Sequence, residues 1–467
     1  MFNSGKATLY FLLCFTLLDT TFLKAQTKGD YVLSKIEFIG NQKTTLKTIL
    51  RELPFSEGDT IPVNEFHEKI KKAKQNLTNT SLFNFVSIDT IAADRAHTEL
   101  LISLKERWYL WPNPIFEISE RNFNSWLENP TLNRVSYGAY LVKNNFRGRK
   151  ETLQILARLG YSENYGFSYS IPYLTKKQNI GLAFSYAFSR NHEIQYGTKN
   201  NQQLFFKDID KNVRQEVNAR LKITYRPGIY TNYTGEIRYN RAKITDSIFQ
   251  LAGDYFNNSK NSIEFFSINL QYRIDKRDNK AYPLSGFLFT CDASKLGLGL
   301  IKREEVDVFR IEIQNSNYFK LHERLYFAEG AKLKISPSNT PYYLQRGLGF
   351  SDYVRGFEVF LIDGSSFGLF KSNFKYQIVK PRIQRLAFLP IEKFNTFHYA
   401  FYVNLFADAG YVFNKKVSEG NFLENKALYS SGIGIDFVSY YDLVFRIEGT
   451  WNSINQTGLF LHLVAPI

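Results

Sequence analysis

The sequence predicts a transmembrane antiparallel β-barrel of about 16 strands, preceded by one small α+β domain. Aromatic residues make up 16% of the 467 residues, but the mean hydropathy is only −0.29. Beyond residue 113, apolar and polar residues alternate in one segment after another. A barrel in lipid combines these properties, because apolar outward positions alternate with polar positions that line its interior. No later segment reaches about 18 consecutive apolar residues, which argues against a helical membrane protein.

The N-terminus has the pattern of an export signal. Lys6 precedes an apolar run over residues 9–18, and Ala25 stands just before Gln26. This order predicts a secretory signal peptide at residues 1–25, cleaved after Ala25. The run is shorter than the roughly 20 apolar residues that a spanning helix needs. A buried N-terminal helix is the alternative interpretation.

The formal net charge of +15 would ordinarily suggest a nucleic-acid partner. An export signal argues against that class, and the basic residues are scattered, often at alternate strand positions such as Arg220 and Lys222. We expect them to line the barrel interior or to contact lipopolysaccharide phosphates. After removal of the signal only Cys291 remains, so an intrachain disulfide is impossible.

Residues 30–108 predict the small α+β domain. A short alternating strand at 35–39 is followed by two segments with helical spacing, the second of which Asn64 is expected to cap. Strands over 83–91 and 98–106 complete the order strand-helix-helix-strand-strand. A generic α+β domain of another kind is the alternative. The apolar stripes of the two helices are Leu46, Ile49, Leu50 and Leu53, and Phe66, Ile70, Ala73 and Leu77.

Residues 113–467 predict the barrel. The segments 151–159, 217–226 and 268–275 each place apolar residues on one face and several charges on the other. So many charges do not fit the inside of a β-sandwich, so we expect the apolar face to point outward. About 355 residues at roughly 20–24 per strand and connection give about 16 strands, an even number as single-chain barrels require. A soluble, secreted all-β protein is the alternative.

A loop arginine and a strand carboxylate form the candidate functional pair. In the alternating run from Phe397 onward, Asp408 lies on the polar face and is expected to point into the lumen. Arg355 in a nearby loop is expected to pair with it, because an unpaired buried ion costs on the order of several kcal/mol. Gly356 would let the loop turn tightly, and Phe357 would wedge against the wall. An ordinary solvated loop is the alternative.

The sequence around this pair contains two motifs, Val354-Arg355-Gly356-Phe357 and Phe406-x-Asp408-x-Gly410. The first resembles the lumen-loop motif of the BamA/TamA superfamily of outer-membrane insertases. The second resembles the strand motif that anchors that loop. Further similar segments are Arg121-Asn122-Phe123-Asn124, Asn145-Phe146-Arg147-Gly148, residues 275–287 and residues 432–437.

The N-terminal domain resembles a POTRA domain, the periplasmic module of the same superfamily. The similarity rests on Gly40 and Asn41 after the first strand, on Gly58 and on Phe83. Gly40 would permit the turn out of the first strand, and Phe83 would seat a later strand on the helices.

The resemblance implies an outer-membrane protein with its POTRA domain in the periplasm. It implies a factor that assembles or translocates other proteins, accepting client strands at the POTRA sheet edge and at a lateral seam of the barrel. The expected partners are unfolded outer-membrane proteins, membrane lipid or lipopolysaccharide, and accessory periplasmic proteins or lipoproteins, with no nucleic acid. A dedicated secretion conduit or a passive pore is the alternative function.

The sequence argues against an enzyme, a metal site and a cofactor. Its six histidines form no His-x-x-x-His pair, and Cys291 has the outward parity of its strand. His398 has inward parity but no serine motif accompanies it, so it is interpreted as a polar lumen residue. An outer-membrane lipase is the enzyme hypothesis that a lipid-hydrolysis assay would test.

The sequence departs from the family pattern in two places. Phe374-Lys375-Tyr376-Gln377 stands where a Glu-x-Arg pattern is expected, which leaves the lumen partner on that strand open. The chain ends Leu463-Val464-Ala465-Pro466-Ile467, whereas outer-membrane barrels usually end in an aromatic residue. Pro466 lacks a backbone donor, so it is expected to loosen the end of the last strand.

Overall fold

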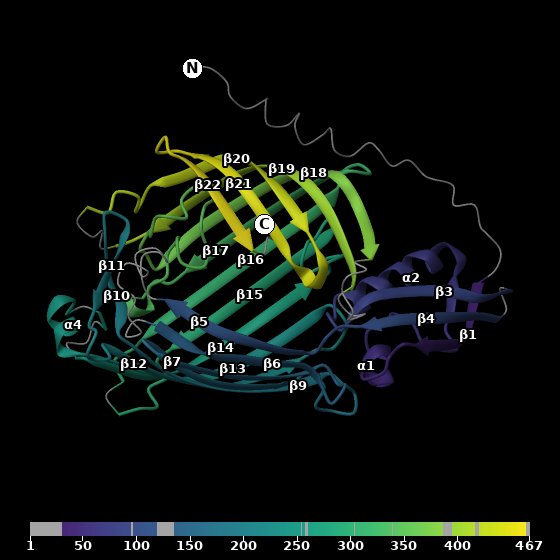
Figure 1. Ribbon diagram of the computed structural model, residues 1–467, viewed down its shortest axis with the longest axis horizontal. Helices are drawn as coiled ribbons and strands as arrows, with labels where there is room; N and C mark the ends of the chain where they lie inside the picture. Colours follow the sequence, from purple (N-terminus) through teal and green to yellow (C-terminus); the bar gives the residue numbers. More distant parts are fainter. Residues whose placement is uncertain are drawn as a thin grey trace, which may run out of the picture.

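The computed structural model describes residues 30–94, 97–118, 135–253, 255–256, 260–302, 304–338, 340–385, 395–415 and 420–463. The expected export signal at residues 1–25, the segment 121–124 and the C-terminal residues 464–467 lie outside this range. Figure 1 shows a small domain of strands and helices at one end of a large, barrel-shaped sheet. The predicted fold class is confirmed.

The N-terminal domain is a four-stranded sheet covered by two helices. Its strand order is β2-β1-β4-β3, in which β1 and β4 are parallel and the other neighbours are antiparallel. Buried residues from both helices and from all four strands form one core. The elements are β1 (Asp30–Ile39), α1 (Leu46–Leu50), β2 (Thr60–Pro62), α2 (Val63–Thr78), β3 (Phe83–Asp94) and β4 (His97–Glu106).

One detail of this domain corrects the sequence analysis. Helix α2 begins at Val63 with Pro62 as its N-cap, so Asn64 lies inside the first turn and does not cap the helix. The fixed backbone angle of proline suits the start of a helix, which explains how the helix begins without a side-chain cap. The short strand β2 was not expected, because three residues carry no readable alternation.

The remaining chain forms a 16-stranded antiparallel sheet, which confirms the predicted strand number. Each strand pairs with its neighbours in chain order, except that β9 pairs directly with β12. The strands are β5 (Leu110–Ile118), β6 (Val135–Phe146), β7 (Glu151–Gly160), β8 (Ser162–Ile171), β9 (Ile180–Asn191), β12 (Arg214–Tyr225), β13 (Thr231–Ile244), β14 (Ser262–Asp275), β15 (Gly286–Leu296), β16 (Val308–Lys320), β17 (Leu325–Ile335), β18 (Ser366–Arg385), β19 (Thr396–Phe413), β20 (Ala427–Val438), β21 (Val444–Asn452) and β22 (Thr457–Leu463).

The outer face of the sheet is apolar. On β12, Leu221, Ile223 and Tyr225 are exposed, while the intervening Lys222 and Thr224 line an interior cavity. This is the inverted pattern that the alternation predicted, with apolar side chains pointing out and charged ones pointing in. No helix within the described ranges is long and apolar enough to cross a membrane.

The two ends of the barrel differ. The end beside the N-terminal domain, here called the proximal rim, consists of short turns and the 3-10 helix η3 (Tyr440–Asp442). The opposite end, here called the distal mouth, carries longer connections that the sequence analysis did not predict as ordered. They contain β10 (Glu193–Lys199), β11 (Gln202–Lys207), α4 (Asp246–Leu251) and η2 (Tyr342–Leu344).

The hairpin β10–β11 is held against loops on other strands through Asn201, which is fully buried. Its side-chain amide donates to the carbonyl oxygen of Leu361, and its side-chain oxygen accepts from the amides of Phe422 and Leu423. Its own backbone amide donates to the side chain of Asn421. These contacts tie three separate loops together at the distal mouth.

The sheet has two ends, β5 and β22, which we call the seam. Backbone hydrogen bonds join all the other pairs of neighbouring strands in this sheet. Among the described residues, no such bonds join β5 to β22. Figure 1 shows both strands on the same side of the barrel.

Candidate functional site

The connection between β17 and β18, described over residues 336–338 and 340–365 and here called the lumen loop, places Arg355 inside the barrel, where it is 2% exposed. Its Nε and Nη2 atoms donate to the two carboxylate oxygens of Asp408 on β19, at 2.8 and 2.6 Å. Its backbone amide also donates to this carboxylate, at 3.1 Å. The structure therefore brings together the two residues that the sequence analysis singled out, in the two-point geometry that arginine permits and lysine does not.

The guanidinium has three further partners. Its central carbon, Cζ, lies 3.8 Å from the ring centroid of Phe406. Nη1 donates to Glu448 on β21 at 3.1 Å, and Nη2 donates to the carbonyl oxygen of Ser372 on β18. A buried ion that is both paired and hydrogen-bonded in this way offsets much of its desolvation cost.

The spacing of the β19 motif follows from this contact. Phe406, Asp408 and Gly410 are alternate residues and so share the inward face of the strand. Phe406 contacts the guanidinium face and Asp408 binds its edge. A Cβ atom at Gly410 would lie 2.5 Å from a methyl carbon of Val354, so glycine is required for the loop to pack this closely.

Gly356 and Phe357 hold the loop tip in place. Gly356 has a φ of +85°, which favours glycine, and its carbonyl oxygen accepts from the side-chain amide of Asn452 on β21. Phe357 is 1% exposed within a cluster of apolar residues from the loop, β18 and β19. The loop is thus packed inside the barrel by side chains as well as by the ion pair.

The charged contacts continue beyond Glu448 along the inner wall. Arg446 on β21 binds both carboxylate oxygens of Asp436 on β20, at 2.6 and 2.9 Å. Tyr282, from the proximal turn after β14, donates to the same carboxylate. Because Arg446 also lies 3.7 Å from Glu448, one network runs from the proximal rim to the lumen loop.

Lys375 points into the lumen from the segment 374–377, where the sequence departs from the family pattern. It is 1% exposed on β18, and its ammonium lies 4.5 Å from the ring centroid of Tyr282. A single lysine thus occupies the inner wall beside the Asp436–Arg446 pair, and an aromatic ring contacts its charge.

The lumen loop also contacts the last strand. The rings of Tyr353 and His462 on β22 stack with 13° between their planes, and their centroids are 5.7 Å apart. Together with the contacts to Glu448 and Asn452 on β21, this places the loop tip against the hairpin that ends at the seam.

A second set of contacts fixes the N-terminal domain to the proximal rim. Glu52, at the end of α1, binds Arg226 of the turn after β12 through two hydrogen bonds of 2.6 and 2.7 Å. Tyr173 donates to the same carboxylate. Burial raises the pKa of Glu52, but hydrogen bonds from Arg226 and Tyr173 and the nearby charge of Lys150 outweigh it and hold the pKa at about 2.

Two more sets of contacts hold the N-terminal domain against the proximal rim. The Asn79 side chain donates to the carbonyl oxygens of Arg277 and Asp278 in the turn after β14. Arg107, just after β4, binds Asp442 of η3 at 2.6 and 3.0 Å. The Arg107–Asp442 ion pair joins the residues just before β5 to the turn before β21. These two segments lie on opposite sides of the seam.

The four residues that carry the POTRA resemblance lie within the N-terminal domain. Gly40 has a φ of +88°, and a Cβ there would lie 1.9 Å from the carbonyl oxygen of Leu104. Gly58 also has a φ of +88°, Asn41 follows Gly40 in the turn, and Phe83 is buried in the core. Within the described part of the chain, none of these four residues contacts the lumen loop.

Sequence reasoning missed several members of both sets. Arg446 and Glu448 are alternate inward residues on β21, and Asp436 points inward from β20, so charge at that parity was a usable signal. Arg226 ends the alternating segment 217–226 on its charged face, but Glu52 follows a short helix, and neither position indicates that the two residues meet.

Comparisons with known proteins agree with this architecture. A family model described as the Omp85 superfamily domain matches residues 145–439, and a POTRA model, described as a surface antigen variable number repeat, matches residues 31–107. No curated protein matches the sequence.

Similar solved structures include two that match over 93% of this chain. One is CdiB from Escherichia coli, with 12% identity, 76% of its own chain covered and a TM-score of 0.56. The other is BamA from Haemophilus ducreyi lacking POTRA domains 1–3, with 15% identity, 83% covered and a TM-score of 0.49. At such low identity the likeness to CdiB shows the fold alone. Because the superfamily model matches well over half of the chain, and a POTRA model matches the domain before it, this protein belongs to the Omp85 superfamily and includes a POTRA domain.

Proposed function

We propose that this protein sits in the outer membrane, with its POTRA domain in the periplasm, and assists the insertion or translocation of other proteins. The observation that carries the proposal is the seam, where β5 and β22 lack the hydrogen-bonded pairing that joins all other neighbours in the described sheet. Unpaired strand edges are templates for another strand, so a client strand can add at this position. No bond-making chemistry is needed for this role.

The POTRA sheet provides a first docking edge. In the order β2-β1-β4-β3, the outer edge of β3 has no strand partner among the described residues. An extended client segment can hydrogen-bond along the twelve-residue strand β3, because strand addition uses backbone groups and tolerates many sequences.

The contacts at the proximal end of the seam and on its inner side support a controlled opening. Arg107 and Asp442 bridge its proximal end, and the lumen loop presses on β21 and β22 from inside. The lumen loop is in turn tied to Asp408 on β19, away from the seam. We therefore assign the Arg355–Asp408 pair the role of holding the loop as an internal support while the seam opens.

Locking the seam tests the proposal. Single cysteines at Phe116 on β5 and Leu459 on β22, both exposed on the outer face of the sheet, in a Cys291→Ser background, would be joined with a bifunctional thiol reagent. The locked protein is expected to lose client insertion into proteoliposomes, and reduction of a cleavable reagent should restore it. A matched pair at Ile237 and Ile268, which are register partners on β13 and β14, should be joined without loss. Full activity with a completely locked seam would remove the mechanism.

A dedicated secretion conduit or a passive pore is the second candidate function. The charged inner wall favours passage of a polar substrate, but the lumen loop and the tied loops at the distal mouth would have to move first. Depletion of the protein followed by profiling of the outer membrane separates the candidates. Broad loss of barrel proteins supports an insertion factor, and loss of a single exported protein supports a conduit.

A further inference from the structure

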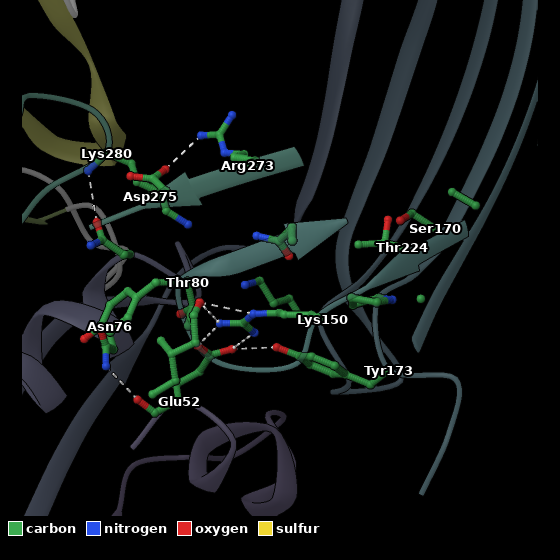
Figure 2. Close-up of a pocket in the computed structure, with 18 of the residues that line it drawn as sticks. Glu52, Asn76, Thr80, Lys150, Ser170, Tyr173, Thr224, Arg273, Asp275 and Lys280 are labelled. Carbon is green, nitrogen blue, oxygen red and sulfur yellow. Dashed lines mark hydrogen bonds and ion pairs between the residues drawn. The ribbon is translucent and has the colours of Figure 1, made fainter. Parts of the chain in front are cut away.

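A cavity of about 220 Å³ lies between the POTRA domain and the proximal rim of the barrel. Figure 2 shows it with Glu52, Asn76 and Thr80 on the POTRA side and Lys150 and Arg273 on the barrel side. The other lining residues come from the first strands of the barrel and from the turns after β6, β8, β12 and β14. The cavity belongs to neither the lumen-loop contact nor the seam.

The side chains that line this cavity carry a net positive charge. Six basic side chains and two acidic ones line it, an excess of four positive charges. The two carboxylates are already engaged, because Glu52 binds Arg226 and Asp275 binds both Arg273 and Arg277. Three lysines are left over. Lys150, Lys222 and Lys280 form no ion pair with any residue in the described ranges.

Lys150 and Lys280 lie among like charges. Burial, together with the charges of Lys280, Arg226 and Arg51, lowers the pKa of Lys150 to about 8, although Glu52 acts in the opposite direction. Burial and the charges of Arg226 and Arg273 also lower the pKa of Lys280. Six basic groups at one cavity with only two carboxylates among them destabilise the docked arrangement, so an anion bound in the cavity would reduce this repulsion.

Neutral polar groups suited to an oxyanion line the same space. Ser170 and Thr224 offer hydroxyl donors and Asn232 offers an amide donor. Ser170 on β8 and Thr224 on β12 come from the two strands that flank β9, and both are drawn in Figure 2. Several ammonium donors around a small, multiply charged group are typical of phosphate recognition. A single carboxylate would leave most of the excess charge uncompensated.

We infer that this cavity is a binding site for a phosphate group, held by Lys150, Lys222 and Lys280 at the junction of the POTRA domain and the barrel. The phosphate would come either from solution or from a lipid headgroup that enters at the rim. Because the site touches both the domain and the barrel, a bound phosphate would strengthen their docking. This inference does not depend on the protein's action on clients.

The test is direct binding to the full-length mature protein. Inorganic phosphate would be titrated into protein held in dodecyl maltoside, with phosphorus NMR and calorimetry as readouts. We expect a Kd of about 1 mM or below, and a loss of about tenfold for each charge-assisted hydrogen bond removed by Lys150→Gln or Lys280→Gln. Lys150→Arg should keep most of the affinity. Lys176→Gln, an exposed lysine of the adjacent turn that does not line the cavity, is the matched control.

Nanodiscs distinguish the two sources of phosphate. If a lipid headgroup fills the site, nanodiscs of phosphatidic acid should block binding of inorganic phosphate and nanodiscs of phosphatidylcholine should not. Equal binding in both supports phosphate from solution. The inference is overturned if the wild-type protein does not bind phosphate below about 10 mM, or if Lys176→Gln weakens binding as much as Lys150→Gln does. Retention of the heat-modifiable band on unboiled gels shows that each variant is folded.

Discussion

Glu52 and Arg226 join the POTRA domain to the barrel through a two-point ion pair that is buried at their interface. The two residues lie 174 positions apart in the chain, so this contact exists only in the docked arrangement. Asn79, Arg107 and Tyr173 reinforce it from three sides. The POTRA domain therefore has one preferred orientation at the proximal rim, which sets the direction from which a client on β3 would approach the barrel.

Removing one partner of this pair should loosen the docking. Glu52→Gln leaves the Arg226 charge buried without its counter-charge, which costs on the order of 3–5 kcal/mol. Spin labels at Lys47→Cys on α1 and Lys176→Cys in the neighbouring turn, in a Cys291→Ser background, should report a broader distance distribution. The double variant Glu52→Arg with Arg226→Glu should restore part of the order. An unchanged distribution in Glu52→Gln would show that the other contacts suffice.

The same pair predicts how docking depends on pH. The pKa of Glu52 is about 2 when docked and about 4.3 in an unfolded chain. A lowered pKa stabilises the docked form above the unfolded value, and this stabilisation is lost as the pH falls from about 4 toward 2. The spin-label distances should therefore broaden over that range. Glu52→Gln should remove this contribution and leave only that of Asp442, whose pKa the Arg107 contact also lowers against the effect of burial.

Arg355→Ala is expected to free the lumen loop and impair function while most of the barrel stays folded. It leaves Asp408 and Glu448 as buried carboxylates without their shared cation. Arg355→Lys should rescue little, because one ammonium cannot bind both oxygens of Asp408 as the guanidinium does. The measurements are client insertion and the heat-modifiable shift on unboiled gels. Arg346→Ala, an exposed arginine of the same loop, is the control. Full activity with an unaltered shift in Arg355→Ala would refute the role of the pair.

Gly410→Ala should weaken the seating of the loop without touching a charge. The added Cβ atom meets Val354 at 2.5 Å and Leu348 at 3.0 Å. Overpacking of this kind costs about 1–3 kcal/mol. Val354→Ala in the same chain should relieve the clash, which a double-mutant cycle in urea unfolding would detect. Gly368→Ala on the neighbouring strand meets nothing within 4 Å and should be close to neutral.

Asn201→Gly should loosen the distal mouth. Glycine keeps the positive φ of this position, 56°, but loses the side chain that binds Leu361, Phe422 and Leu423. Each buried backbone group left unpaired costs about 1–3 kcal/mol. Conductance in planar bilayers should rise or become more variable. Asn200→Gly has nearly the same φ at an exposed position and serves as the control. Equal conductance of the two variants would contradict the assignment of Asn201 as a tie.

Much of the barrel follows from local sequence alone. A period of two assigns each strand residue to one face, so the outward Leu221 and the inward Asp408 were both predicted correctly from their neighbours. The strand number followed from length, because each crossing of a membrane needs a similar stretch of chain. The pairing of the loop motif with the strand motif was predicted from the parity of the strand residues and from the family resemblance.

Which inward residues meet was decided only by the tertiary structure. Parity places Asp436, Arg446 and Glu448 inside, but their pairing depends on strand register and on the curvature of the sheet, which local sequence does not encode. Arg226 ends an alternating strand segment and Glu52 follows a short helix in another domain, so only the docking of one domain on the other gives them a shared site. The same docking collects Lys150, Lys222 and Lys280 from three separate strands and turns around one cavity, where charge that looked scattered along the chain becomes concentrated.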